Sequence, residues 1–218
     1  FESLNLIVPR IQGGGSSEDL GTDHGIYDFL IRNGVGPGQA SRFTKNVPTY
    51  WGKQPILEAP AYIGITVFFF ALFGFILSKG PMRNTLIFGT LLSLFLSMGK
   101  NVPIITDFFI YNFPFYNKFR AVSSIQVILE ICLPVSASIG LYYLFYNDKK
   151  IKFNQFIKIA IIPIVLLLVV FLSKEMLSFN GINDSYLREI YGSDLFLKIK
   201  SARESIFQTD ILRAIFFC

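Results

Sequence analysis

One stretch of the sequence combines aromatic rings with basic side chains, a combination that could bind a lipid phosphate. It runs from Asn101 to Ser124 and carries Lys118 and Arg120 near its C-terminal end. Two neighbouring cations can neutralise a phosphate or an anionic headgroup. Aromatic rings gather where hydrocarbon meets headgroups, and those of this stretch are Phe108, Phe109, Tyr111, Phe113, Phe115, Tyr116 and Phe119. The alternative is an ordinary connector whose rings anchor the neighbouring helices.

A polar stripe follows in the next apolar segment. At about 100° per residue, its members fall within roughly a third of a helix circumference; they are Arg120, Ser123, Gln126, Glu130, Pro134 and Ser138. A carboxylate within a membrane span is costly and normally faces protein or water. We therefore expect Gln126 and Glu130, together with Asp107, to line a cavity for a polar or lipid-linked substrate. The alternative is that Glu130 joins one helix to another.

Metal and cofactor chemistry finds little support in the residue spacing. The single histidine, His24, lies in an acidic segment that lacks the calcium-loop pattern D-x-[DN]-x-[DN]-G. The two cysteines, Cys132 and Cys218, suit neither a metal site nor a disulfide framework. The glycine-rich segments lack the phosphate-loop pattern GxxxxGK[ST]. We predict no metal and no cofactor.

The composition indicates an integral membrane protein. Of the 218 residues, 52% are hydrophobic and 16% are charged, whereas soluble domains carry about 25% charged residues. The net charge of +5 is interpreted through membrane topology, because no RNP, zinc-finger or arginine-rich motif accompanies it. We expect membrane lipids as partners and no nucleic acid.

The apolar runs predict an all-α, polytopic transmembrane helical bundle with about four spans in residues 60–172. The expected spans are about 62–77, 85–98, 121–146 and 156–172. The first two are short against the ~20 residues that cross ~30 Å of hydrocarbon. Interfacial aromatic anchors are expected at Trp51, Tyr62, Tyr111 and Tyr116.

The charged loops predict how the chain crosses the membrane. The loops Ser78–Asn84 and Asn147–Lys152 are short and basic, and such loops lie in the cytoplasm. The opposite, extracytoplasmic face would then hold three regions, which are residues 1–59, the aromatic loop 99–120 and the charged segment 173–213. Residues 214–218 have the composition expected at the start of a further span.

Several motifs together resemble the YfhO-like family of bacterial membrane proteins. The matching pieces are Val8–Glu18, Pro48–Gly64, Ser97–Phe109, Phe115–Ser124 and Arg203–Phe217. They occur in the family's order and cover most of the chain. Members of this family are much longer, so the resemblance implies that these residues are a middle part of a longer protein.

The resemblance implies a fold similar to the GT-C class of glycosyltransferases. Such enzymes lie in the bacterial inner (cytoplasmic) membrane and transfer a sugar from a polyprenyl-phosphate donor to a cell-envelope acceptor on the extracytoplasmic side. It further implies metal-independent, inverting transfer. Lys118 and Arg120 would bind the donor phosphate, with aromatic rings beside the prenyl chain. The family's catalytic acid lies in a loop that these residues do not include, so none of them is assigned that role.

Two other function classes stay open. The chain could be a non-catalytic membrane subunit that scaffolds a larger envelope complex, with the aromatic loop as a surface for protein partners. It could also be an ion-coupled transporter that uses Glu130 and Pro134 in an interrupted helix. The transporter class would require a second interrupted span in an internal repeat, and the sequence shows none.

Overall fold

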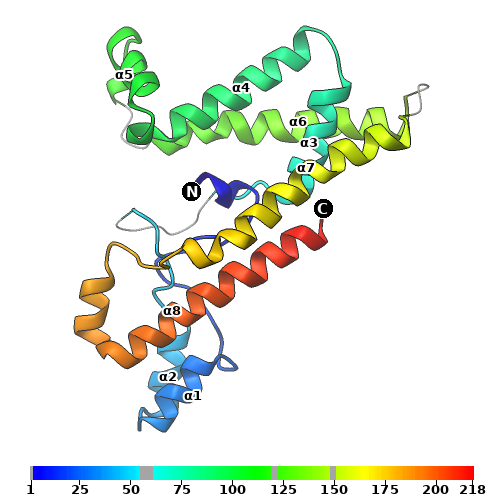
Figure 1. Ribbon diagram of the computed structural model, residues 1–218. Helices are drawn as coiled ribbons and strands as arrows, with labels where there is room; N and C mark the ends of the chain where they lie inside the picture. The colour runs from blue at the N-terminus through cyan, green and yellow to red at the C-terminus, as the bar shows by residue number, and fades with distance from the viewer. Residues whose placement is uncertain (1, 55–60, 119–121, 148–150) are drawn as a thin grey trace. The chain divides into compact units, whose positions relative to one another are not determined.

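The computed structural model is all-α (Figure 1) and describes residues 2–54, 61–118, 122–147 and 151–218. Its α-helices are α1 (Gly25–Arg32), α2 (Pro37–Thr44), α3 (Ile65–Leu77), α4 (Pro81–Ser97), α5 (Pro103–Asn112), α6 (Gln126–Phe145), α7 (Phe153–Leu172) and α8 (Asp184–Phe216). Short 3₁₀ helices cover Glu2–Leu6, Gly99–Asn101, Tyr116–Lys118, Val122–Ile125 and Ser173–Met176. Within these ranges the only β pairing is an isolated bridge between Glu18 and Val47. The predicted all-α class is confirmed.

Two helices among the described residues are long and apolar enough to cross a membrane. They are α6 and the continuous segment Phe153–Met176, which joins α7 to the 3₁₀ turn after it. Helix α3 is apolar but has only 13 residues, and α4 has 17. A straight helix rises 1.5 Å per residue, so neither of these reaches ~30 Å by itself. The four-span bundle therefore stays a prediction beyond these two segments.

The chain divides into two compact units. The terminal unit consists of residues 1–62 and 166–217, and the central unit consists of residues 63–165 with Cys218. Helix α7 begins in the central unit and ends in the terminal one. The predicted regions 1–59 and 173–213 both fall in the terminal unit, whereas α3 to α6, with the aromatic loop, form the central unit.

Close backbone approach holds α3 against α6 in the central unit. A Cβ added to Gly140 would lie 2.1 Å from the Phe70 carbonyl oxygen, and one added to Gly74 would lie 1.9 Å from that of Ser136. The Ser136 hydroxyl donates to the Ala71 carbonyl at 3.1 Å. Small residues and a serine at a helix contact are typical of membrane helix pairs. In Figure 1, α4 lies at an angle to α6 and meets it near the beginning of α6.

The terminal unit is built around an apolar core between α1, α2 and α8. Its buried members are Ile26, Leu30, Ala40, Val47, Leu195, Ile199 and Ala202. Helix α1 begins at His24, whose Nδ1 accepts a hydrogen bond from the Ile26 backbone N–H at 3.2 Å. Helix α8 is interrupted at Gly192, where φ is 76° and ψ is 166°. Glycine adopts this backbone conformation without a steric penalty.

A buried arginine ties α8 to the loop that precedes the central unit. Arg203 is fully buried, and its Nη1 donates to both carboxylate oxygens of Asp184, at 2.9 and 3.0 Å. Its Nη2 donates to the carbonyls of Pro48 and Tyr50, each at 3.3 Å. Burial lowers the pKa of Arg203, and the charge of Asp184 opposes that change. The pairing is what makes a buried charge tolerable here.

Candidate functional site

The central unit contains an apolar groove of about 400 Å³, here called the aromatic groove. Its described lining residues are Gly89, Leu92, Ser93, Leu96, Phe109, Phe113, Pro114, Tyr116, Ile125 and Ile128. They come from α4, from α5 and the turn after it, and from the start of α6. The groove is therefore formed by the predicted aromatic loop together with the two helices that flank it.

Aromatic packing shapes one wall of this groove. The rings of Phe109 and Phe113 stack with centroids 4.5 Å apart, and Tyr116 lies 5.6 Å from Phe109. Helix α5 ends before Pro114, and the chain then reverses at Phe115, where φ is 66°. This reversal returns Tyr116 to the groove. The wall is accordingly built from local turn geometry rather than from a long-range contact.

The chemistry of the aromatic groove suits hydrocarbon. No ionisable side chain other than the Tyr116 phenol stands among its described lining residues, and burial raises the pKa of that phenol. The Ser93 hydroxyl is already used, because it donates to the Ile125 carbonyl at 2.6 Å. A flexible apolar chain can fill such a space without leaving a polar group unpaired.

Lys118 lies next to this groove along the chain. It belongs to the same 3₁₀ turn, Tyr116–Lys118, as the lining residue Tyr116, and its side chain is exposed. In the described part of the chain, no carboxylate pairs with Lys118. Arg120, the other predicted phosphate ligand, lies outside the described residues. One predicted phosphate-binding cation, Lys118, therefore lies in the same turn as a residue that lines the apolar groove.

The predicted cavity-lining residues do not line the aromatic groove. Asp107 is exposed on α5, as is Tyr111 at 83%. On α6, Gln126 is half-buried and Glu130 is exposed. The buried face of α6 consists of Leu129, Cys132, Leu133, Ser136, Ala137 and Gly140. Glu130 therefore lies off the packed face, and its role in a cavity stays a prediction.

The predicted interfacial rings of the terminal unit differ in exposure. Trp51 is buried, and its ring centroid lies 5.1 Å from that of Phe179. Tyr62 is half exposed. An interfacial role for either ring stays a prediction. Trp51 also contributes to the packing of the terminal unit.

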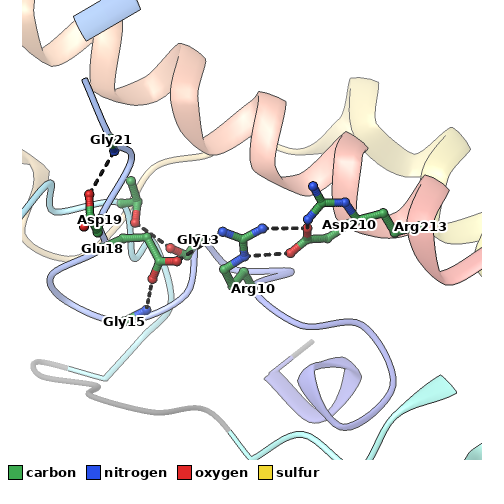
Figure 2. Close-up of polar contacts among 9 residues, drawn as sticks. Arg10, Gly13, Gly15, Glu18, Asp19, Gly21, Asp210 and Arg213 are labelled. Atoms are coloured by element: carbon green, nitrogen blue, oxygen red, sulfur yellow. Dashed lines mark hydrogen bonds and ion pairs between the residues drawn. The ribbon is translucent and has the colours of Figure 1, made fainter. Parts of the chain in front are cut away.

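A network of ion pairs joins an N-terminal loop to α8 within the terminal unit (Figure 2). Arg10 donates from Nε and Nη2 to the two carboxylate oxygens of Asp210, at 2.9 and 2.8 Å. Its Nη1 donates to Glu18 at 3.2 Å. These hydrogen bonds raise the pKa of Arg10 despite its partial burial. Asp210 is itself fully buried, so the network fixes the loop 10–18 on α8.

The ion pairs formed by Arg10, Asp184, Arg203 and Asp210 were not predicted from the sequence. Arg10 and Asp210 are 200 residues apart, and no local pattern joins them. One signal was present on α8, where Arg203 and Asp210 share a helix face with Ile199 and Ile206 at spacings of three and four residues. Charged residues on the apolar stripe of a helix are expected to be buried and paired.

No three His, Cys, Asp or Glu side chains gather in a metal-binding arrangement within the described ranges. Comparisons of the chain with protein-family models, with curated proteins and with solved structures find no match. The resemblance to the YfhO-like family therefore stays a prediction. The function is therefore inferred from the geometry and chemistry of the aromatic groove and its neighbouring residues.

Proposed function

We propose that this protein is a multi-pass protein of the bacterial inner membrane that binds a polyprenyl-phosphate sugar and belongs to a glycosyltransferase of GT-C type. The observation that carries the proposal is the aromatic groove with Lys118 in the turn that bounds it. The acceptor would be a component of the cell envelope, reached on the extracytoplasmic side.

The groove fits the lipid part of such a donor. Its volume of about 400 Å³ lies within the roughly 300–1,000 Å³ of small-molecule sites. It accommodates a segment of an isoprenoid chain against the rings of Phe109 and Phe113. Leu92 and Leu96 of α4 supply the facing aliphatic surface.

The donor phosphate would lie at Lys118, with Arg120 as the second cation. A phosphate that leaves during sugar transfer gains negative charge, and fixed cations stabilise that charge. These residues bind and orient the lipid phosphate. They do not activate the acceptor hydroxyl, a role that the resemblance assigns to a loop that these residues do not include.

Crosslinking of the lipid tests the proposal directly. The native protein in lipid nanodiscs is incubated with a photoreactive polyprenyl phosphate, and labelled peptides are identified by mass spectrometry. We expect labelling at the aromatic groove. Leu92→Trp fills the groove and should abolish that labelling, whereas Leu91→Trp, at an exposed position on α4, should leave it unchanged. Equal labelling of both variants would exclude the groove as the lipid site.

The phosphate contact has its own variant in the same experiment. Lys118→Glu should weaken labelling about tenfold or more, because a favourable charge contact becomes a repulsive one. Lys79→Glu makes the same change at another exposed position of the central unit and should have little effect. An assay of sugar transfer from a polyprenyl-phosphate sugar by the native protein then distinguishes an enzyme from a lipid-binding protein.

Exposed helix surface favours the scaffold as a second candidate. In the most apolar 18-residue windows of α6 and of Phe153–Met176, only 28% and 22% of the residues are buried. Such surface contacts either lipid or other membrane helices. Stoichiometric co-purification of envelope proteins, without lipid labelling or sugar transfer, would establish the scaffold and exclude the transferase.

A further inference from the structure

We infer that the terminal unit carries a second binding site, separate from the aromatic groove, which takes a neutral polyhydroxylated ligand of the saccharide class. This site, here called the Gln12 hollow, is argued from its own residues. It rests on the proposed function only for the origin of the sugar, which is either the lipid-linked donor or the envelope acceptor.

The Gln12 hollow has a volume of about 500 Å³. Its described lining residues are Gln12, Trp51, Gly52, Lys53, Leu177, Asn180, Gly181 and Ile182. They come from three segments that are far apart in sequence and lie in the same unit. A hollow of this size can hold one or two sugar rings.

A buried polar atom marks this hollow as a binding site. Gln12 is only 6% exposed, and its side-chain Oε1 accepts no hydrogen bond from the described residues. An acceptor that is removed from water without a donor is costly. Rotation of the Gln12 side chain toward the hollow would let a ligand hydroxyl supply the donor that this oxygen lacks.

The surrounding backbone holds Gln12 and the tryptophan ring together. The Gln12 carbonyl accepts a hydrogen bond from the Trp51 backbone N–H at 3.0 Å. A Cβ added to Gly181 would lie 3.0 Å from the Trp51 Cα, so the loop that carries Gly181 approaches Trp51 closely only because that residue is glycine. Asp184 accepts from the Gly181 N–H at 2.8 Å and is held by Arg203. The backbone of the site is therefore preformed.

The mixture of apolar surface and neutral amide groups suits a saccharide. Trp51, Leu177 and Ile182 give apolar surface for the C–H faces of a sugar ring. Asn180 is exposed at the rim and offers both a donor and an acceptor. A purely hydrocarbon ligand would leave the Gln12 oxygen unpaired.

The fluorescence of Trp51 provides a direct test, because it is the only tryptophan in the chain. The native protein is placed in lipid nanodiscs, since maltoside detergents would introduce a competing sugar. Methyl glycosides of glucose, mannose and N-acetylglucosamine are then titrated to about 100 mM. We expect at least one to give a saturable fluorescence change. Gln12→Ala should weaken that binding about tenfold, and Gln39→Ala, on the exposed side of α2, should not alter it.

Asn180→Ala is a second variant that should not disturb folding, because Asn180 is exposed. We expect it to weaken glycoside binding severalfold. No saturable change with any probe, or equal affinities for wild type and Gln12→Ala, would overturn the inference. Sugar binding that survives in Lys118→Glu while lipid labelling is lost shows that the two sites are independent. Competition by a polyprenyl-phosphate sugar assigns the hollow to the donor, and binding of free glycosides without that competition assigns it to the acceptor.

Discussion

At the scale of single residues, polar side chains in the terminal unit act as links between segments. His24 is an example, because its ring nitrogen serves as the N-cap of α1 by accepting the Ile26 N–H at 3.2 Å. Burial lowers its pKa, which favours the neutral ring required for that role. The ordinary histidine pKa is about 6.5.

The pKa of His24 predicts a loss of stability in acid. As the pH falls below about 6.5, the unfolded chain takes up the proton before the folded chain does, so the free energy of unfolding decreases. Above that pH the contribution is fully present. NMR titration of the single histidine should give a pKa below 6.5. His24→Asn keeps a good N-cap without titrating, so the difference in stability between wild type and this variant should change with pH over this window. A difference that does not change with pH would contradict the assignment.

At the scale of helices, α3 and α6 pack through glycines where their backbones touch. This contact needs no large side chain, and any Cβ at Gly140 would overlap the Phe70 carbonyl. The backbone of a packed helix cannot yield as a flexible side chain can. The helix pair is therefore sensitive to one added methyl group.

Gly140→Ala should destabilise the central unit by about 1–3 kcal/mol, because overpacking forces the two helices apart. The matched change, Gly38→Ala in exposed α2, meets no atom within 4 Å and should be neutral or stabilise by up to about 1 kcal/mol. Thermal unfolding in the same detergent compares the two. A Tm for Gly140→Ala as high as that of Gly38→Ala would show that the helices do not meet at these glycines.

At the scale of the whole molecule, residues from the two ends of the chain form one unit. Arg203 of α8 pairs with Asp184 at the start of the same helix and connects it to the loop that leads from Pro48 toward Trp51. Arg10 makes a second connection of the same kind to Asp210. The Gln12 hollow lies on loops that these arginines hold in place.

Removal of Arg203 should therefore unfold the terminal unit more readily. Arg203→Met leaves Asp184 buried without a partner, which should cost about 3–5 kcal/mol. Removal of both charges in Arg203→Met with Asp184→Leu should recover part of that loss. Arg42→Met, on the exposed face of α2, should change stability by less than about 0.5 kcal/mol. Thermal unfolding of the three variants and the wild type provides the comparison, and equal Tm values for Arg203→Met and Arg42→Met would refute the buried-pair account.

The sequence by itself determined the helical class and the approximate positions of the four apolar helices α3, α4, α6 and α7. Long apolar runs predicted α6 and α7 close to their observed bounds, because hydrophobicity and length are properties of consecutive residues. The same reasoning identified the aromatic loop, which does contribute Phe109, Phe113 and Tyr116 to a groove. It also predicted that Gln126 and Glu130 line a cavity. That expectation stays a prediction, because a polar stripe on a helix does not show which neighbour the stripe contacts.

Only the tertiary structure decided which distant residues meet. Arg10 binds Asp210, which lies 200 residues later in the sequence, and Gln12 lines the same hollow as Asn180. Local periodicity predicts neither contact, because each contact depends on how segments far apart in the sequence fold against one another. Helix formation depends on neighbours within a few residues, whereas a binding site depends on contacts that the folded chain alone brings together.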